Sequence, residues 1–488
     1  MFKNLVFICL CLFSSQFLLA QNSKDIMKSA EVYMNKGQYD KALFEYNRIA
    51  QKSKKMAGLY LNRGLAYERL KKYKEALADY QLALKLDTKN KFKKQIYFNL
   101  GNLCYTVKKF KLASKHYTTI INKYERLDKN IYFNRAIAYS EQKIPLLAIK
   151  DYTEAIKLDK KYKEAYLKRG VLWAGREKYD QAIADFDQVI LIDPKDKNAH
   201  LYKANAKYDL GKIEESLLGY DKVIGLDAKN QEALRARARI LSDSGLIDRA
   251  LTDYSTLIQI DPKDRMALHR RAEIYASQNN IDLAVADYTN IITIEPKKDI
   301  LAYLRRGIIY RFQKKNEDAI ADLTKYINAK KDNIDAFYNR ALANRALENI
   351  AQAVKDYDEL VKLDDKNADY FNNRGFLRNK LKLYKEAQAD FDKAISLKTD
   401  FAFAYNNRAT AKYFLNKHKE ALADAKKSLE LLPNNAFAYN NLGLINSKLT
   451  QLDQAMKDFD KAIELSPENE EFKANKAQLQ AELDKKKK

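Results

Sequence analysis

One helix-turn-helix unit of about 34 residues recurs thirteen times between residues 23 and 467, and it constrains the fold more than any other feature. A small residue marks the same place in each unit; nine of the twelve spacings between markers are 34, two are 35 and one is 37. The markers are Ala30, Gly64, Gly101, Ala136, Gly170, Ala204, Ala238, Ala272, Gly307, Ala341, Gly375, Ala409 and Gly443. Such a period is typical of a solenoid, in which each unit packs on its neighbours. A scaffold or binding surface is therefore expected before an enzyme.

The pattern inside each unit indicates two closely packed helices. With the marker numbered 8, position 20 is alanine in every unit except one, where it is Ser216, and position 24 is aromatic in eleven of thirteen units. Small residues at positions 8 and 20 let antiparallel helices approach, and the aromatic ring fills the groove beside them. Five of the six prolines occupy position 32, where the second helix must stop.

These residues resemble the tetratricopeptide repeat family. Repeat five matches the family pattern through the residues Tyr166-Leu167-Lys168-Arg169-Gly170, Trp173, Tyr179, Ala182, Phe186 and Pro194. The resemblance covers about nine tenths of the chain. It implies an all-α fold, an α-solenoid of about thirteen helical pairs in a right-handed superhelix, with a concave groove for peptide or protein segments.

The two ends of the chain differ from the array. Lys3, an apolar run and the small residue Ala20 have the order of a secretory signal peptide cleaved after Ala20, with an uncleaved anchor as the alternative. We therefore expect a signal peptide at 1–20, a continuous array at 23–467, and a capping helix with a lysine-rich tail at 468–488. Cleavage would leave one cysteine, Cys104, and no intramolecular disulfide. The bacterial periplasm, or secretion to the cell surface, is the expected location.

The formal net charge of +24 would attract polyanions. The lysines are spread through the turns, however, and the tyrosines recur at helix-packing positions rather than along an open groove for bases to stack on. Nucleic acid is therefore not the expected partner. A peripheral contact with an anionic envelope surface remains compatible with this charge.

Asparagines recur on the face where a ligand is expected. The family resemblance places positions 2, 5, 6, 9, 12 and 13 of each first helix in the groove. An amide offers both a donor and an acceptor, so a row of amides can bond the backbone of an extended peptide. This arrangement is similar to the asparagine ladder of the O-linked N-acetylglucosamine transferases, whose catalytic domain has no counterpart here. The predicted peptide-binding residues are Asn62, Asn99, Asn134, Asn339, Asn372, Asn373, Asn406, Asn407, Asn440 and Asn441. The alternative is that these amides only solvate the groove.

Arginines occupy groove positions in the middle of the array. Their planar fork suits a carboxylate or phosphate, which predicts an acidic ligand or partner; the alternative is a solvated face paired with nearby acids. The predicted acidic-ligand residues are Arg235, Arg239, Arg270, Arg305, Arg311 and Arg345. No lysine occupies position 5, so the family's carboxylate clamp for chaperone tails is not expected.

A second set of arginines has a structural interpretation. Position 7 is arginine in nine units, and position 23 is aspartate in ten. Opposite charges that recur in register predict a repeated ion pair between the two helices of a unit. The arginines are Arg63, Arg135, Arg169, Arg237, Arg271, Arg306, Arg340, Arg374 and Arg408.

Residues for catalysis are scarce. The four histidines fall in four different repeats, and the sequence contains neither a Cys-x-x-Cys pair nor a glycine-rich phosphate loop. We predict no enzyme activity, no cofactor, no metal and no small-molecule substrate. The leading interpretation is a scaffold or adaptor of the cell envelope that docks peptide or protein segments, some of them acidic, in its groove. A polyanion-binding envelope protein and a self-assembling scaffold are the alternatives, and the oligomeric state is left open.

Overall fold

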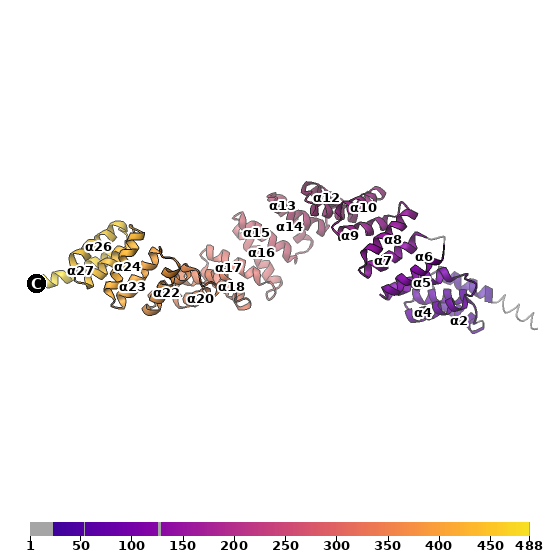
Figure 1. Cartoon of the computed structure of the whole chain (residues 1–488), viewed down its shortest axis with the longest axis horizontal. Helices are drawn as coiled ribbons and strands as arrows, with labels where there is room; N and C mark the ends of the chain where they lie inside the picture. Colours follow the sequence, from indigo (N-terminus) through magenta and orange to yellow (C-terminus); the bar gives the residue numbers. More distant parts are fainter. Residues whose placement is uncertain (1–22, 53, 125–127, 488) are drawn as a thin grey trace, which may run out of the picture. The chain divides into compact units, whose positions relative to one another are not determined.

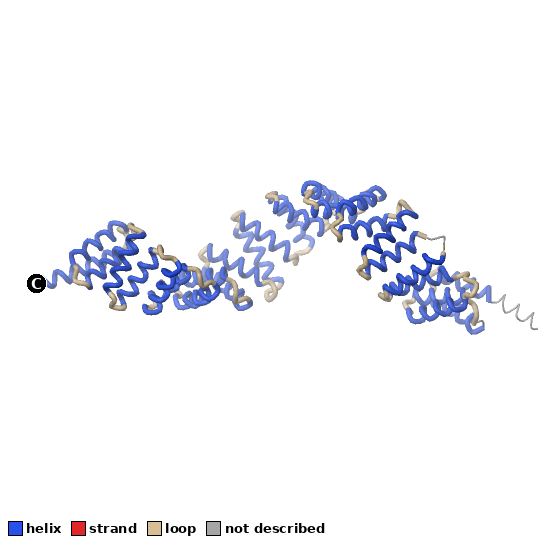
Figure 2. Tube along the Cα trace, in the orientation of Figure 1, coloured by secondary structure: helices blue, strands red, loops and turns tan. Residues whose placement is uncertain are grey.

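The computed structural model describes residues 23–52, 54–124 and 128–487, which form helices joined by short turns (Figures 1 and 2). These described ranges contain no strand, and the predicted all-α solenoid is confirmed. Residues 23–35 are helical and begin repeat one. The predicted signal peptide, residues 1–20, lies outside the described residues.

First and second helices alternate along the chain. The first helices of repeats two to thirteen are α3 (Ala57–Arg69), α5 (Lys93–Thr106), α7 (Lys129–Glu141), α9 (Lys163–Ala174), α11 (Lys197–Asp209), α13 (Gln231–Asp243), α15 (Arg265–Ser277), α17 (Ile300–Phe312), α19 (Ile334–Ala346), α21 (Ala368–Lys380), α23 (Ala402–Phe414) and α25 (Ala436–Lys448). The second helices of repeats one to thirteen are α2 (Tyr39–Lys52), α4 (Tyr73–Leu86), α6 (Phe110–Lys123), α8 (Pro145–Leu158), α10 (Tyr179–Ile192), α12 (Ile213–Leu226), α14 (Ile247–Ile260), α16 (Ile281–Ile294), α18 (Asn316–Ala329), α20 (Ile350–Leu363), α22 (Tyr384–Leu397), α24 (His418–Leu431) and α26 (Leu452–Leu465). The helix α27 (Glu470–Lys487) follows them.

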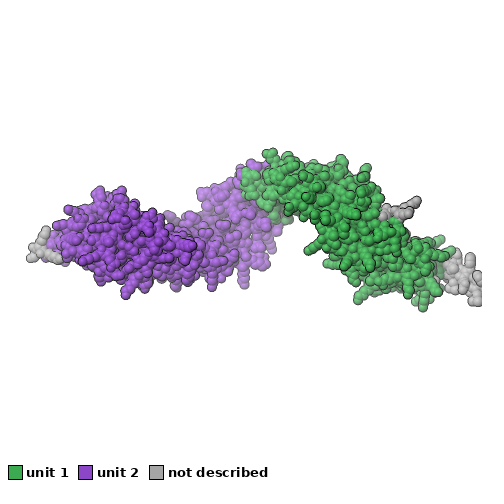
Figure 3. Space-filling model, viewed as in Figure 1, with its two compact units in different colours: residues 1–244 green, residues 245–488 purple. Residues whose placement is uncertain are grey.

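The chain divides into two compact units, residues 1–244 and 245–488 (Figure 3). The boundary falls in the turn between α13 and α14, inside repeat seven. Within each unit, each helix packs on the next one along the chain, so the core is a series of local clusters rather than one centre. Nearest-neighbour packing of this kind is the defining property of a solenoid.

The small residues at positions 8 and 20 hold the two helices of a repeat together closely, as predicted. In repeat thirteen a methyl group added to Gly443 would lie 2.6 Å from the ring of Phe459, so the aromatic ring occupies the space of the missing side chain. Phe186 and Phe391 press on Gly170 and Gly375 in the same way. All three phenylalanines are almost fully buried.

The turn between the two helices of a repeat uses a left-handed residue at position 15. Gly37, Gly211 and Gly245 fill it in three repeats, whereas lysine, glutamate, asparagine or Thr450 fill it in others. The backbone N–H of the following residue then donates to the carbonyl five residues earlier in the chain. Lys72, for example, donates to the carbonyl of Tyr67 at 2.9 Å. This bond pattern satisfies the last carbonyls of the first helix. It also turns the chain at once into the second helix.

An arginine at position 7 links three helices in most repeats. Arg169 in α9 donates from Nε and Nη2 to the two carboxylate oxygens of Asp185 in α10, at 2.8 and 2.6 Å. Its third nitrogen, Nη1, donates to Thr153 Oγ1 in α8 of the preceding repeat at 2.8 Å. One guanidinium therefore joins its own repeat to the one before it.

The predicted ion pairs form wherever both partners lie in one unit. They are Arg63–Asp79, Arg135–Asp151, Arg169–Asp185, Arg271–Asp287, Arg306–Asp322, Arg340–Asp356, Arg374–Asp390 and Arg408–Asp424. Arg237 and Asp253 lie on opposite sides of the unit boundary. The structural interpretation of this arginine set is thus confirmed for these eight pairs.

Burial makes each of these aspartates dependent on its arginine. Asp356 is 2% exposed, and burial raises the pKa of its carboxyl while Arg340 opposes that rise. A buried carboxylate without a cation is costly, since the charge loses its hydration and gains nothing in return.

Replacing Arg340 with leucine should destabilise repeat ten by about 3 kcal/mol, because it leaves the Asp356 charge buried and unpaired. Hydrogen exchange should show lost protection in α19 to α21 and unchanged protection in α9 to α11, since solenoid units couple to their neighbours. The loss should shrink at acidic pH, where Asp356 takes up a proton and no longer needs a cation.

Arg270→Leu provides the matched control, because Arg270 is exposed and pairs only with Glu273 on its own helix. It should change stability by no more than about 0.5 kcal/mol. Equal effects of the two substitutions would contradict the structural role of the position-7 arginine.

Candidate functional site

A pocket of about 470 Å³ lies on the first helices of repeats ten to thirteen. Its lining combines phenylalanines, asparagine amides and one arginine: Arg345, Asp369, Asn372, Asn373, Phe376, Phe401, Phe403, Asn406, Asn407, Asn435 and Phe437. We call it the Phe–Asn pocket. These residues belong to α19, α21, α23 and α25 or to the turns that precede them, and none of them comes from a second helix.

Two phenylalanines of the pocket are turned to solvent. Phe403 is 56% exposed and Phe437 is 58% exposed, and both occupy position 2 of their repeats. Exposed apolar side chains that lie together beside polar groups are typical of a surface that another molecule covers, whereas single exposed ones are common. Phe376 lies partly buried beside them, with the Arg345 guanidinium 5.5 Å from the centre of its ring.

The asparagines of repeats eleven to thirteen bond to each other between neighbouring repeats. Asn407 donates to Asn372 Oδ1 at 3.1 Å, and Asn441 donates to Asn406 Oδ1 at 2.8 Å. Each rung joins position 6 of one repeat to position 5 of the repeat before. Asn475 continues the series by donating to Asn440 Oδ1 at 3.0 Å.

The rung of Asn372 and Asn407 keeps hydrogen-bonding capacity for a ligand. When two amides share one bond, the Oδ1 of the donating amide and the Nδ2 of the accepting amide are not used in it. In the rung of Asn372 and Asn407, the remaining acceptor is Asn407 Oδ1, and both side chains line the Phe–Asn pocket. The remaining donor, Asn372 Nδ2, makes a long contact of 3.5 Å to Asn373 Oδ1. One donor and one acceptor are what the backbone of an extended peptide needs.

The asparagines nearer the start of the array have different partners. Asn99 is buried and accepts from Gln95 at 2.8 Å, while Asn134 donates to Asn102 at 3.1 Å. Asn62 is half-buried in α3. These three lie in unit 1, and the remaining predicted asparagines lie in unit 2.

The predicted arginine site also falls in both units. Arg235 and Arg239 belong to unit 1, with the Arg239 guanidinium 5.0 Å from the centre of the Tyr208 ring. Arg270, Arg305, Arg311 and Arg345 belong to unit 2. Arg305 is exposed in α17.

In unit 2, one arginine of the predicted acidic-ligand set forms a hydrogen bond with one asparagine of the predicted peptide-binding set. Arg311 donates from Nε to Asn339 Oδ1 at 2.9 Å, across repeats nine and ten. Asn339 is 8% exposed and also donates to the carbonyl of Asp335 at 2.8 Å. The amide of Asn339 is thus engaged inside the protein on both its oxygen and its nitrogen.

Some residues of the site were missed by the sequence reasoning, although the register marks them. Phe403 and Phe437 stand at position 2, a groove position at which the sequence analysis singled out no residue. Asn475 stands 34 residues after Asn441, at position 6 of a further unit whose marker position holds Ala477. Asn475 could therefore have been predicted if residues 470–487 had been aligned with the first helices of the repeats.

Other features of the described residues offer little chemistry. His269 Nε2 lies 2.9 Å from Asp299 Oδ1, in a local contact within repeat eight. Residues 23–52, 54–124 and 128–487 hold no group of three or more histidine, cysteine or acidic side chains suited to a metal ion. Across the same ranges, every helix is too short or too polar to cross a membrane.

Comparisons with known proteins agree with the repeat architecture. Family models described as tetratricopeptide repeat match residues 55–126, 133–197, 167–233, 235–298, 300–333, 334–367, 368–401 and 436–469. Together these matches cover more than half of the chain.

Individual relatives match shorter or more divergent stretches. The human tetratricopeptide repeat protein 12 is 34% identical over 85 residues, which is 17% of this chain and 12% of that protein. The structure of YrrB, a TPR protein with an unusual peptide-binding site, is 21% identical, covers 39% of this chain and 97% of its own, and has a TM-score of 0.36. A tetratricopeptide repeat protein from Parabacteroides merdae is 19% identical, covers 51% and 98%, and has a TM-score of 0.35. On the repeat matches, this chain belongs to the tetratricopeptide repeat family, whose members are in general protein–protein interaction scaffolds.

Proposed function

We propose that this protein is an adaptor of the cell envelope that docks extended segments of partner proteins on the first-helix face of repeats ten to thirteen. The observation that carries the proposal is the Phe–Asn pocket, where two exposed phenylalanines lie beside paired amides. Apolar rings would anchor side chains of the segment, and the amide rungs would bond its backbone. A rigid surface of this kind binds without first paying an ordering cost.

The charge of the pocket favours a segment that carries an acidic residue. Arg345 contributes a cation at one edge of the pocket, and Asp369 is the acidic residue of the lining. Arg345 stacks on Phe376, which leaves the edges of its planar fork free to meet a carboxylate. Such a contact would add selectivity to the apolar anchors rather than replace them.

The polyanion alternative has less support in this arrangement. Arg311 bonds Asn339, and Arg270 pairs with Glu273. Each of these cations is already engaged within the protein, and an anionic polymer would compete with those contacts. Weak dependence of partner binding on salt would distinguish the adaptor from a polyanion binder, whose affinity falls steeply as salt rises.

Replacing Phe403 with alanine should weaken binding of a peptide selected on the full chain by at least about tenfold. A buried aromatic anchor at an interface is worth about 2 kcal/mol or more, and exposed Phe403 supports little of the fold. Peptides taken from a random display library supply the ligand, and calorimetry measures the affinity.

Phe44→Ala is the matched control, since Phe44 is also exposed, at 64%, but lies on α2 in unit 1. It should leave the affinity unchanged. If both substitutions weaken binding equally, or neither does, the selected peptides do not use the Phe–Asn pocket and the proposal fails.

The amide rungs should contribute to stability as well as to binding. Asn441 donates to Asn406 Oδ1 at 2.8 Å and to Thr410 Oγ1 at 2.9 Å, so Asn441→Ala should cost about 1–2 kcal/mol in the last repeats. Asn373→Ala removes the long contact from Asn372 and a weak interaction with the Tyr357 hydroxyl, so it should cost less than Asn441→Ala, about 0.5 kcal/mol. Chemical denaturation compares the two variants. Equal stability of both would contradict the inter-repeat rungs.

We also propose that the chain is exported, on the strength of residues 1–20. The order of Lys3, an apolar run and Ala20 is that of a cleavable leader. Expressed in a bacterial host with its own N-terminus, the protein should be recovered from the envelope fraction beginning at Gln21. Intact-mass measurement of the purified protein decides this point: a mass that includes residues 1–20 in a cytoplasmic fraction would overturn the proposal.

A further inference from the structure

Repeat thirteen departs from the arginine–aspartate register. Position 7 holds Leu442 in place of arginine, but position 23 keeps its aspartate, Asp458, which is only 5% exposed. The carboxylate accepts from Asn446 Nδ2 at 2.7 Å and from Gln454 Nε2 at 2.8 Å. Two neutral amides therefore bind the aspartate that is paired with a guanidinium in eight other repeats.

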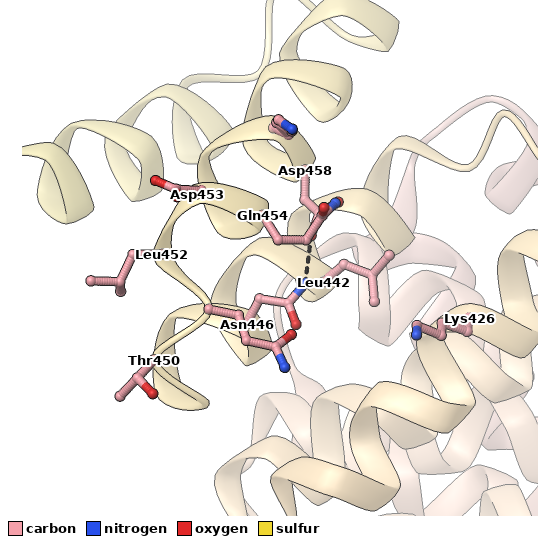
Figure 4. A pocket seen from close by; sticks show the side chains of 10 residues that line it. Lys426, Leu442, Asn446, Thr450, Leu452, Asp453, Gln454 and Asp458 are labelled. Atoms are coloured by element: carbon pink, nitrogen blue, oxygen red, sulfur yellow. Dashed lines mark hydrogen bonds between the residues drawn. The ribbon is translucent and has the colours of Figure 1, made fainter.

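A pocket of about 710 Å³ opens at this place. Figure 4 shows Asp458, Asn446 and Gln454 gathered together, with Leu442 between them and Lys426 of α24. Asn446 is 3% exposed, and its Oδ1 is buried without a hydrogen-bond partner. We call this the Asp458 pocket. It contains the buried carboxylate of Asp458 and the unpaired amide oxygen of Asn446, and both groups can accept hydrogen bonds from N–H donors.

Repeat ten shows what completes such a site. Asn344 there donates to Asp356 Oδ2 at 3.3 Å, as Asn446 donates to Asp458. Arg340 donates to the same carboxylate from Nη2 at 2.6 Å. The carboxylate of repeat ten thus binds an asparagine and a guanidinium together. Repeat thirteen keeps the asparagine and lacks the guanidinium.

We propose that the Asp458 pocket binds the guanidinium of an arginine side chain from a partner protein. The bound group would take the place that Arg340 has in repeat ten, donating to Asp458 and to the free Oδ1 of Asn446. A planar fork with several donors satisfies both acceptors at once, which a single ammonium does less well. This contact does not depend on the Phe–Asn pocket.

The charges around the pocket set the conditions for binding. Asp453 and Asp458 line it, as do Lys426 and Lys457, which are both exposed. Lys426 stands at position 25, where Thr153 and Thr324 accept from the arginine of the next repeat. Lys426 cannot accept such a bond, so it limits the affinity. Burial raises the pKa of Asp458, so binding should strengthen as pH rises through that pKa.

The test is calorimetric titration of the full chain with N-acetyl-L-arginine N-methylamide. The citrulline analogue, which has the same shape without the charge, is the ligand control. Leu442→Arg should abolish binding and raise thermal stability, because the new side chain fills the pocket and restores the register. Asp458→Asn should weaken binding at least about tenfold through loss of a charge-assisted bond. Lys426→Thr should tighten binding by about threefold or more by removing a like charge.

Saturable binding of the arginine probe by the wild type, lost in both Leu442→Arg and Asp458→Asn, would support the proposal. If Leu442→Arg does not fold, Asp458→Asn and Lys426→Thr still decide the matter through their opposite effects. Absence of saturable binding to the wild type would overturn the proposal. Equal binding of the citrulline analogue, or unchanged binding in Asp458→Asn, would overturn it as well.

Discussion

The position-7 guanidinium is the interaction on which the rest of the array depends. Its five donors lie in one plane, so it can hold both oxygens of a buried aspartate in its own repeat and still reach the second helix of the repeat before. Apolar packing brings helices together within and between repeats, and the guanidinium adds a directional polar link between neighbouring repeats. The guanidinium supplies that link, and it requires the same spacing each time.

Repeats six and thirteen lack the position-7 arginine, and they differ in what happens to the aspartate at position 23. In repeat six Lys203 replaces the arginine and pairs only with Asp187 of the preceding repeat, and Gly219 stands at position 23 in place of the aspartate. There both members of the pair have changed together, and no buried charge is left over. In repeat thirteen only the arginine has changed, which leaves Asp458 and a pocket. An unbalanced change of this kind marks a place where a partner can supply the missing group.

Much of the fold could be predicted because its determinants repeat in register. The spacing of markers such as Gly443 gave the helical pairs, and the charges at positions 7 and 23 gave the ion pairs. Contacts across repeats were harder to predict, since a position on a helix face does not reveal which neighbour its side chain will bond. Asn407 was expected to bind a ligand, and the structure shows it bonded to Asn372 of the preceding repeat. Arg311 and Asn339 were expected in separate sites, and they bond each other.

The most direct measurement for the docking surface is site-specific photo-crosslinking from the full chain in its native extract. A photoreactive phenylalanine analogue at position 403 reports on the Phe–Asn pocket, and the same analogue at exposed position 427, on the second helix α24, reports on another face. The adaptor account predicts a discrete protein crosslink from position 403 that is retained at high salt and absent from position 427. Crosslinks of equal strength from both positions, or none from position 403, would contradict it.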